Sequence, residues 1–148
     1  MSYVDLHVHS TSSDGTVPAD ELPALIAGAG LAGFALTDHD TTAGHEAAER
    51  AAAAVGVRFI PGVEISADRG KPRGSMHILG YGVQRGTPQL NAVIDELHAA
   101  RSERAPIIVD KLNGLGIDIT MEEVDAYAGC AMIGRPHIAG VLMNKGYV

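Results

Sequence analysis

Short apolar segments alternate with helical segments along the first 85 residues, and this order constrains the fold more than any other feature. The apolar runs predict strands at residues 3–8, 33–37, 57–60, 63–66 and 76–83. Helical spacing of apolar residues predicts one helix capped by Thr16, and a second, alanine-rich helix that Thr42 caps and Gly56 ends. This order of elements favours an α/β fold with a largely parallel sheet.

The pattern becomes helical after Gly86. Pro106 is expected to kink or interrupt the first helix of this region, because proline has no N–H to donate and its ring clashes with the preceding turn. Thr120 and Glu123 form a capping-box pattern for a further short helix. Pro136 suits the start of a last helix. We therefore expect the second part of the chain to begin as a block of helices.

The charge and composition of the chain limit the kinds of partner that it can bind. A net charge of −7 over 148 residues argues against a general nucleic-acid surface. A small phosphorylated substrate remains compatible, because bound metal cations can reverse the local charge. A single cysteine excludes an internal disulfide and is typical of a reducing cytoplasm. No apolar run approaches the ~20 residues of a membrane span and no signal peptide is recognisable, so we expect a cytoplasmic protein without a membrane partner.

His7 and His9 are the sharpest candidates for chemistry. Residues two apart on a strand point to the same face, so these two imidazoles would stand together. Asp5 precedes them and Asp14 follows them, and imidazole nitrogens and carboxylates are common metal ligands. The alternative is a pair of exposed strand histidines, and the two residues alone do not decide between these interpretations.

Further histidines and carboxylates follow the later apolar runs. Asp38, His39 and Asp40 come directly after the second run, where parallel sheets place their active sites. Helix capping is the alternative for the two aspartates. Glu64 follows the third run, and His77 lies in an otherwise apolar strand. A lone glutamate in a loop is usually solvated and a lone buried histidine is usually a core residue, so each is weak by itself.

Together, these side chains predict a metal centre. Each candidate strand brings a histidine or a carboxylate near one end, and mixed nitrogen and oxygen ligands suit zinc, manganese or iron. A carboxylate such as Glu64 can bridge two cations, and two metal ions can hold a phosphate, activate a water and stabilise a leaving oxygen. His45 is not part of this set, because it lies at a polar helix start and is expected to face solvent.

The ordered motifs resemble the polymerase and histidinol phosphatase (PHP) family of metal-dependent phosphoesterases. The stretches that carry the resemblance are Asp5-Leu6-His7-Val8-His9-Ser10, Ser13-Asp14-Gly15, Leu36-Thr37-Asp38-His39-Asp40-Thr41-Thr42, Pro61-Gly62-Val63-Glu64-Ile65-Ser66, His77-Ile78-Leu79-Gly80-Tyr81 and Gly134-Arg135-Pro136-His137. The ordered set is highly specific, whereas any one member is not. The helical region and the last motif are most similar to the subgroup that dephosphorylates 3′,5′-nucleoside bisphosphates and trims short RNA 5′ ends.

The resemblance implies an α/β fold, namely the N-terminal part of a distorted (β/α)7 PHP barrel with a helical insertion. Residues 1–85 would form the first part of the barrel, residues 86–130 the insertion, and residues 131–148 a return to the barrel. The resemblance also implies a cofactor of two to three divalent metal ions. These would be manganese, iron or zinc, with manganese favoured.

The resemblance gives each candidate ligand a role. The implied metal ligands, which are also the implied catalytic residues, are His7, His9, Asp14, His39, Glu64 and His77. His7 and His9 would bind one ion, and Glu64 would bridge it to a second ion bound by His77. Asp14 and His39 would bind the third ion.

Two further residues are implied to bind the substrate. Arg135 would bind a substrate phosphate, a role that suits the planar guanidinium group, and His137 would lie near it. The alternative for Arg135 is a surface salt bridge. The alternative for His137 is an ordinary residue of the first helical turn.

The family domain continues well beyond Val148, since a (β/α) barrel typically needs about 250 residues. The family's later ligands, another histidine and an Asp-x-His pair, do not occur in this chain. We therefore expect a truncated piece of the domain. Its exposed sheet edges and apolar surface would favour self-association or a complementing C-terminal segment.

The predicted activity is hydrolysis of a phosphomonoester by a metal-activated water. The expected substrate is a small phosphorylated nucleotide, a 3′,5′-nucleoside bisphosphate, or a short oligonucleotide or RNA end. One alternative is a histidinol-phosphatase-like or other PHP phosphatase. Another is an inactive truncated module that binds metal without turnover. A nuclease or proofreading domain of a polymerase fits less well with the net charge of −7.

Overall fold

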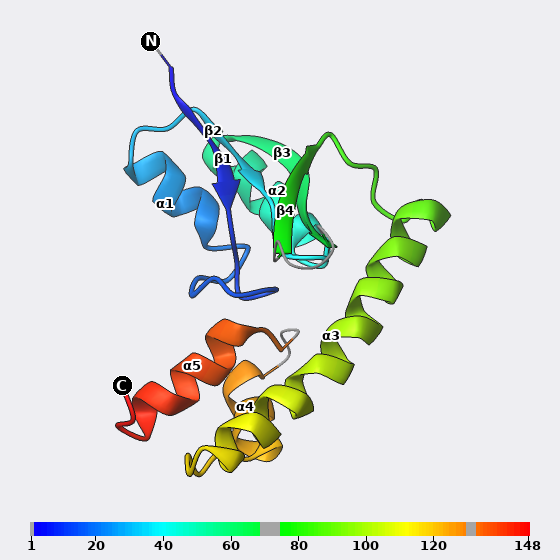
Figure 1. Cartoon of the computed structure of the whole chain (residues 1–148). Coiled ribbons are helices and arrows are strands. Elements are labelled where there is room, and N and C mark those ends of the chain that lie inside the picture. The colour runs from blue at the N-terminus through cyan, green and yellow to red at the C-terminus, as the bar shows by residue number, and fades with distance from the viewer. Residues whose placement is uncertain (1, 69–74, 130–132) are drawn as a thin grey trace. The chain divides into compact units, whose positions relative to one another are not determined.

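The computed structural model describes residues 2–68, 75–129 and 133–148. They form two compact units, Met1–Asn91 and Ala92–Val148, whose positions relative to each other are not determined (Figure 1). Each unit has a hydrophobic core of its own. No helix among the described residues is long and apolar enough to cross a membrane.

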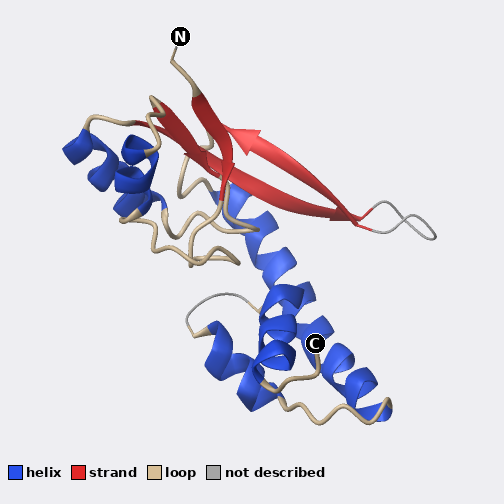
Figure 2. Cartoon of the chain, turned by 90° about the vertical axis from the view of Figure 1, so that its left-hand side faces the viewer, coloured by secondary structure: helices blue, strands red, loops and turns tan. Residues whose placement is uncertain are grey.

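The first unit contains a four-stranded sheet in the order β1, β2, β3, β4. The strands are β1 (Val4–Val8), β2 (Gly33–Leu36), β3 (Arg58–Asp68) and β4 (Ser75–Tyr81). β1, β2 and β3 are parallel, whereas β3 and β4 are antiparallel and form the long ribbon in Figure 2. The predicted α/β fold is confirmed, and the sheet is parallel across its first three strands.

The predicted break between two strands at Pro61 and Gly62 is wrong. β3 continues through both residues and changes partner there, pairing with β2 up to Pro61 and with β4 from Gly62 onward. Proline has no N–H for a ladder hydrogen bond, but the carbonyl of Pro61 still accepts from the amide of Gly82 at 2.8 Å. The strand tolerates a proline because that residue lies where the pairing changes.

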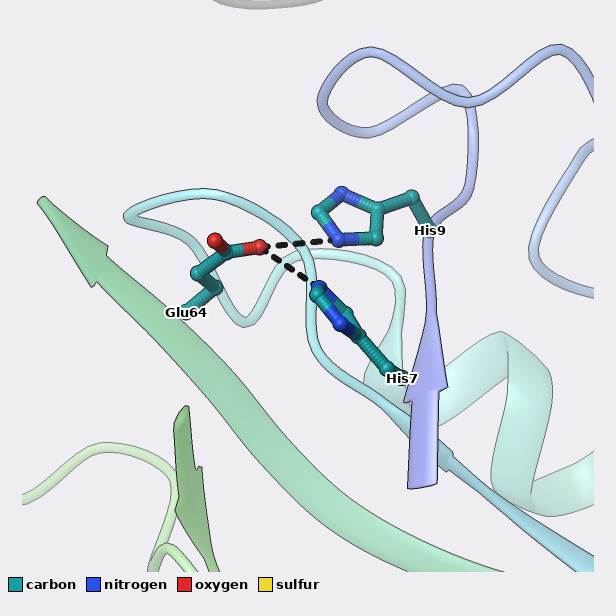
Figure 3. A group of neighbouring side chains, drawn as sticks. All are labelled: His7, His9 and Glu64. Carbon is teal, nitrogen blue, oxygen red and sulfur yellow. Dashed lines mark hydrogen bonds and ion pairs between the residues drawn. The ribbon is translucent and has the colours of Figure 1, made fainter. Parts of the chain in front are cut away.

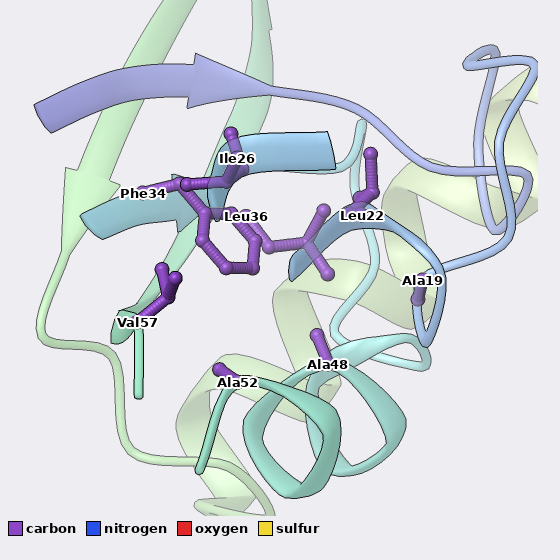
Figure 4. Packing of buried hydrophobic residues seen from close by; sticks show 8 residues of the cluster. All are labelled: Ala19, Leu22, Ile26, Phe34, Leu36, Ala48, Ala52 and Val57. Atoms are coloured by element: carbon purple, nitrogen blue, oxygen red, sulfur yellow. The ribbon is translucent and has the colours of Figure 1, made fainter. Parts of the chain in front are cut away.

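Two helices, α1 (Leu22–Gly28) and α2 (His45–Val55), pack on β2 through one apolar core. Its buried residues, all labelled in Figure 4, are Ala19, Leu22, Ile26, Phe34, Leu36, Ala48, Ala52 and Val57. Phe34 and Leu36 are completely buried, and Phe34 meets Phe59 edge to face with 5.7 Å between ring centroids. This core fixes β2, so the residues that follow β2 leave the sheet from a rigid base.

The predicted N-terminal caps of both helices are wrong. α1 begins only at Leu22, because Thr16 belongs to a loop that is closed by backbone hydrogen bonds. α2 begins after Gly44 rather than at Thr42, and a Cβ atom at Gly44 would lie only 2.9 Å from a core alanine. The predicted end at Gly56 is confirmed, since its φ of 72° favours glycine.

The described part of the second unit is helical. α3 (Pro88–Gly114) begins in the first unit and continues into the second, where α4 (Met121–Ala128) and α5 (Arg135–Asn144) follow. As predicted, Pro136 lies in the first turn of α5. The buried residues of this core are Val109, Ile119, Val124, Ile138 and Val141.

Of the two outcomes predicted for Pro106, an interruption of the helix is wrong and a kink stays a prediction, whereas the predicted capping box is confirmed. α3 is one helix with Pro106 inside it. Its neighbours Ala105 and Val109 are each only 4% exposed, so packing offsets the missing hydrogen bond.

The capping box lies at the start of α4. There the amide of Glu123 donates to the Thr120 hydroxyl at 3.2 Å, and the amide of Thr120 donates to the Glu123 carboxylate at 2.9 Å.

The boundary between the two compact units falls after Asn91. The predicted helical insertion, residues 86–130, follows the helical pattern of the sequence, and compactness does not test its bounds. Its boundaries therefore stay a prediction. Residues 130–132, which include one of these boundaries, lie outside the described part of the chain.

Candidate metal centre

Six side chains of the first unit gather at one end of the sheet, where β1 and β2 end and β3 and β4 pass. They are the six predicted metal ligands, His7, His9, Asp14, His39, Glu64 and His77. The fold thus brings together residues that are far apart in the sequence, because parallel strands end on the same side of a sheet. Their role as ligands remains a proposal.

Glu64 lies at the centre of this cluster. Its side chain is 5% exposed, and Oε2 lies 2.9 Å from Nε2 of His9 and 3.0 Å from Nε2 of His7 (Figure 3). The other oxygen, Oε1, lies 2.7 Å from Nδ1 of His77. A carboxylate that faces histidines with both oxygens has the geometry needed to bridge two cations.

Asp14 lies between His9 and His39. Its Oδ1 is 2.9 Å from Nδ1 of His9, and its Oδ2 is 3.5 Å from Nε2 of His39. The loop turns tightly beside it, since the amide of Gly15 donates to the carbonyl of Ser10 at 3.0 Å. A Cβ atom at Gly15 would lie 2.5 Å from the carbonyl oxygen of His9, so only glycine fits this turn.

The six residues form three overlapping groups, each able to hold one ion. The groups are His7 with His9 and Glu64, His9 with Asp14 and His39, and His39 with Glu64 and His77. In each group the ligand atoms lie within 4.8 Å of one another. Every group combines imidazole nitrogen with carboxylate oxygen, a donor set that fits manganese, iron or zinc.

Mutual interactions keep the carboxylates of the cluster ionised. The hydrogen bond with His9 lowers the pKa of Asp14 from 3.8 to about 2, and the charge of His39 adds to this. Burial acts to raise the pKa of Glu64, but the surrounding histidines outweigh it and the pKa is lowered. Burial also acts to lower the pKa of His9, but Asp14 and Glu64 outweigh it and the pKa is raised. A cation would therefore compete with a proton on His9.

His45 does not face solvent, contrary to the prediction. It is completely buried at the first position of α2, where Nε2 donates to the carbonyl of Gly62 at 2.7 Å. Its ring also meets Phe59 edge to face, with 5.6 Å between centroids. Burial lowers the pKa of His45 and so favours the neutral ring. No local pattern signals this role, because the partner carbonyl belongs to a strand distant in sequence.

Asp38 and Asp40 do not cap α2, whose N-cap is Gly44. Both carboxylates are completely buried. The backbone amide of Ser10 donates to Asp38 at 2.7 Å, and that of Ser66 donates to Asp40 at 2.7 Å. The two aspartates, which flank His39 in the sequence, therefore attach it to the loop after β1 and to β3. The sequence alone did not predict this function.

The two predicted substrate residues, Arg135 and His137, belong to the second unit. His137 is 8% exposed, and its Nδ1 accepts the amide hydrogen of Gly134 at 2.9 Å across the start of α5. Arg135 lines a small pocket together with Arg101 and Arg104. His137 thus has a structural contact in the first helical turn, and the substrate roles of both residues stay predictions.

The comparison with protein families matches residues 5–129 to the PHP domain. A 5′-3′ exoribonuclease of Haemophilus influenzae is 40% identical over 144 residues, which are 97% of this chain and 52% of that protein. A 3′,5′-nucleoside bisphosphate phosphatase of Chromobacterium violaceum is 38% identical over 100% of this chain and 52% of its own length. The chain belongs to the PHP family of metal-dependent phosphoesterases.

Solved structures agree with this assignment. An amidohydrolase from Chromobacterium violaceum with bound sulfate has a TM-score of 0.91 and 36% identity over 99% of this chain and 51% of that one. A metal-dependent phosphoesterase from Bifidobacterium adolescentis has a TM-score of 0.90 and 32% identity, again over 99% of this chain and 51% of that one. The chain thus spans about half the length of the relatives and structures it matches.

Proposed function

We propose that this chain is part of a hydrolase that cleaves a phosphomonoester at the six-residue cluster. The observation that carries the proposal is Glu64, which faces His7 and His9 with one carboxylate oxygen and His77 with the other. With Asp14 and His39 beside them, these residues would hold two to three divalent ions, with manganese favoured.

The residues of this chain would hold the ions and supply the negative charge around them. Bound metal ions would activate a water and stabilise charge on the reacting phosphate. Because the pKa values of Asp14 and Glu64 are lowered, both carboxylates remain anionic and supply the negative charge that retains cations. In the metal-free chain the same carboxylates accept hydrogen bonds from histidines, and these hydrogen bonds hold the imidazole rings close to the positions from which they would bind an ion.

The proposed substrate is a 3′,5′-nucleoside bisphosphate or a short oligonucleotide end. This class is supported by relatives that are named a 3′,5′-nucleoside bisphosphate phosphatase and a 5′-3′ exoribonuclease. The arginine-lined pocket of the second unit, which includes Arg135, supports binding of an anion there. We propose that Arg135 binds a substrate phosphate and that His137 lies near it.

We also propose the domain assignment that the family resemblance implies. Residues 1–85 and 131–148 would belong to the PHP barrel and residues 86–130 to its helical insertion. The two compact units and the helical character of α3 and α4 support a division in this region. A cytoplasmic location is proposed because a single cysteine is typical of reducing compartments.

Phosphate release tests the proposed function. The purified chain would be assayed with a 3′,5′-nucleoside bisphosphate and with histidinol phosphate, each with and without added Mn²⁺. We expect Mn²⁺-dependent release from the bisphosphate, its loss in His9→Ala, and its retention in His98→Ala, a control outside the cluster. Preference for histidinol phosphate would overturn the substrate class, and equal release by both variants would overturn the site.

A further inference from the structure

Asp38 is connected to the loop that carries two of the proposed ligands. Its completely buried carboxylate accepts three hydrogen bonds. The backbone amide of Ser10 donates to Oδ1 at 2.7 Å, the hydroxyl of Ser13 donates to Oδ1 at 2.6 Å, and the hydroxyl of Ser10 donates to Oδ2 at 2.7 Å. Ser10 directly follows His9, and Ser13 directly precedes Asp14. The contacts of Asp38 therefore lie immediately beside both ligands of this loop.

Asp40 is connected in the same way to β3. The amide of Ser66 donates to its Oδ1 at 2.7 Å, and the hydroxyl of Ser66 donates to its Oδ2 at 2.8 Å. Ser66 lies two residues after Glu64 on the same strand. Asp40 has a φ of 52°, the one positive φ among the non-glycine residues that the structure describes. Aspartate tolerates this conformation better than most residues, and in it the Asp40 carboxylate contacts Ser66 on β3.

The backbone of the same segment is also attached to Glu64. The amide of Glu64 donates to the carbonyl of Asp38 at 3.2 Å, and the amide of Asp40 donates to the carbonyl of Glu64 at 2.9 Å. His39 forms an isolated bridge with Glu64 between these two bonds. The segment therefore presents His39 to the cluster while the aspartates on either side contact the neighbouring segments.

We propose that Asp38 and Asp40 are positioning residues of the metal centre, with separate targets. Asp38 sets the loop that carries His9 and Asp14, and Asp40 sets the strand that carries Glu64. This inference rests on the proposed metal site, since it assigns the residues that hold its ligands in place. Metal ligands must be held within about 0.5 Å of the productive geometry, and hydrogen bonds from behind are the usual means.

Burial also argues that these contacts have a purpose beyond ordinary loop stability. A buried carboxylate is costly unless several donors satisfy it, and each aspartate has such donors on both of its oxygens. All of these donors lie within two residues of a proposed ligand. A carboxylate with a purely structural role would not need these donors to lie beside the ligands.

The test compares Asp38→Asn with Asp40→Asn in the full chain, by two readouts. The first is amide hydrogen exchange in the metal-free protein, which does not depend on metal binding. We expect faster exchange of the Ser10 amide in Asp38→Asn alone, and of the Ser66 amide in Asp40→Asn alone. The second is Mn²⁺ affinity by calorimetry, which we expect to fall roughly 10- to 100-fold in each variant.

Combination with Asp14→Asn separates a positioning role from a structural one. If Asp38 acts through Asp14, Asp38→Asn will weaken Mn²⁺ binding much less in the Asp14→Asn background than in the parent. Asp40→Asn will keep its full effect in that background. Equal losses from Asp38→Asn in both backgrounds would overturn the proposal that Asp38 acts through Asp14, and loss of the Asp40→Asn effect would overturn the separate targets.

Milder variants address the case in which an asparagine variant does not fold. Ser13→Ala and Ser66→Ala each remove one hydroxyl donor to an aspartate, and Ser12→Ala changes the same loop without removing a donor to Asp38. We expect weaker Mn²⁺ binding in the first two only. If the parent binds no Mn²⁺, the proposed function fails, and unchanged amide exchange in both aspartate variants would separately overturn the positioning proposal.

Discussion

The two units of this chain have different interiors. Among the described residues, buried polar side chains concentrate in the first unit, where they are Ser10, Ser13, Thr37, Asp38, Asp40, Thr41, His45 and Glu64. In the described part of the second unit, His137 is the one buried polar side chain, and the core is aliphatic. A buried polar group lowers the stability of the fold unless hydrogen bonds satisfy it. The interior of the first unit therefore depends on hydrogen bonds between polar side chains, whereas the interior of the second depends on apolar packing.

The largest expected effect follows from removing the charge at the centre of the polar interior. Glu64→Gln should weaken Mn²⁺ binding more than roughly 100-fold, because changes to groups that only orient a ligand already cost about 10- to 100-fold. Phosphate release should be lost with it. Calorimetric titration with Mn²⁺ measures the affinity, with the exposed Glu49→Gln as the matched control. Equal affinities in the two variants would show that Glu64 is not a ligand.

The opposite result is expected from the aliphatic core. Ile119 is 1% exposed, so Ile119→Ala should reduce the free energy of unfolding by about 2–5 kcal/mol. Mn²⁺ affinity of the folded protein should not change. Urea unfolding measures the first quantity, and Leu115→Ala, at a position that is 78% exposed, is the control. A fall in Mn²⁺ affinity comparable to that of Glu64→Gln would contradict the claim that the core of the second unit serves packing and not metal binding.

The pH dependence of the metal-free chain should originate in the polar interior. The pKa of Asp14 is lowered to about 2 in the folded state, so its contribution is present above 3.8 and is lost as pH falls toward 2. The pKa of His9 is raised, so its contribution is present below 6.5 and is lost as pH rises through the raised value.

Unfolding free energies measured against pH check these signs. Asp14→Asn should remove roughly 1 kcal/mol of the acid-side loss, after discounting for partial exposure. It should also flatten the alkaline-side loss, because it removes the partner that contributes most to raising the pKa of His9. An unchanged profile would mean that this pair does not control the pH dependence.

The smallest expected effect concerns a helix end in the second unit. Thr120→Ala removes the hydroxyl that caps α4 and should reduce the free energy of unfolding by about 1 kcal/mol without altering Mn²⁺ affinity. Thr16→Ala is the matched control, because Thr16 resembles a cap in the sequence but caps no helix in the structure. Equal destabilisation by both changes would contradict the assignment of the caps.

The sequence was sufficient to predict features that depend on ordered motifs or on local contacts. The six clustered residues could be predicted from the ordered motifs that resemble the family. Parallel pairing of β1, β2 and β3 explains why the ends of these strands meet, whereas His77 lies on antiparallel β4. The capping box of Thr120 and Glu123 could be predicted because it is entirely local. The break at Pro61 could not, since the change of pairing partner depends on β4.

The supporting residues could not be predicted, because their partners are distant in sequence. His45 resembles a solvent-facing helix residue until the carbonyl of Gly62 is placed beside it. Asp40 resembles a helix cap until Ser66 is placed beside it. Sequence patterns therefore located the proposed ligands better than the residues that hold them.

The central claim is that six side chains of this chain form one metal centre. Crystals of the chain soaked with Mn²⁺ and measured by anomalous diffraction test it most directly. The account predicts two or three anomalous peaks, each beside one of the three ligand groups, and their disappearance in crystals of Glu64→Gln. Peaks at other side chains, or none at saturating Mn²⁺, would contradict it.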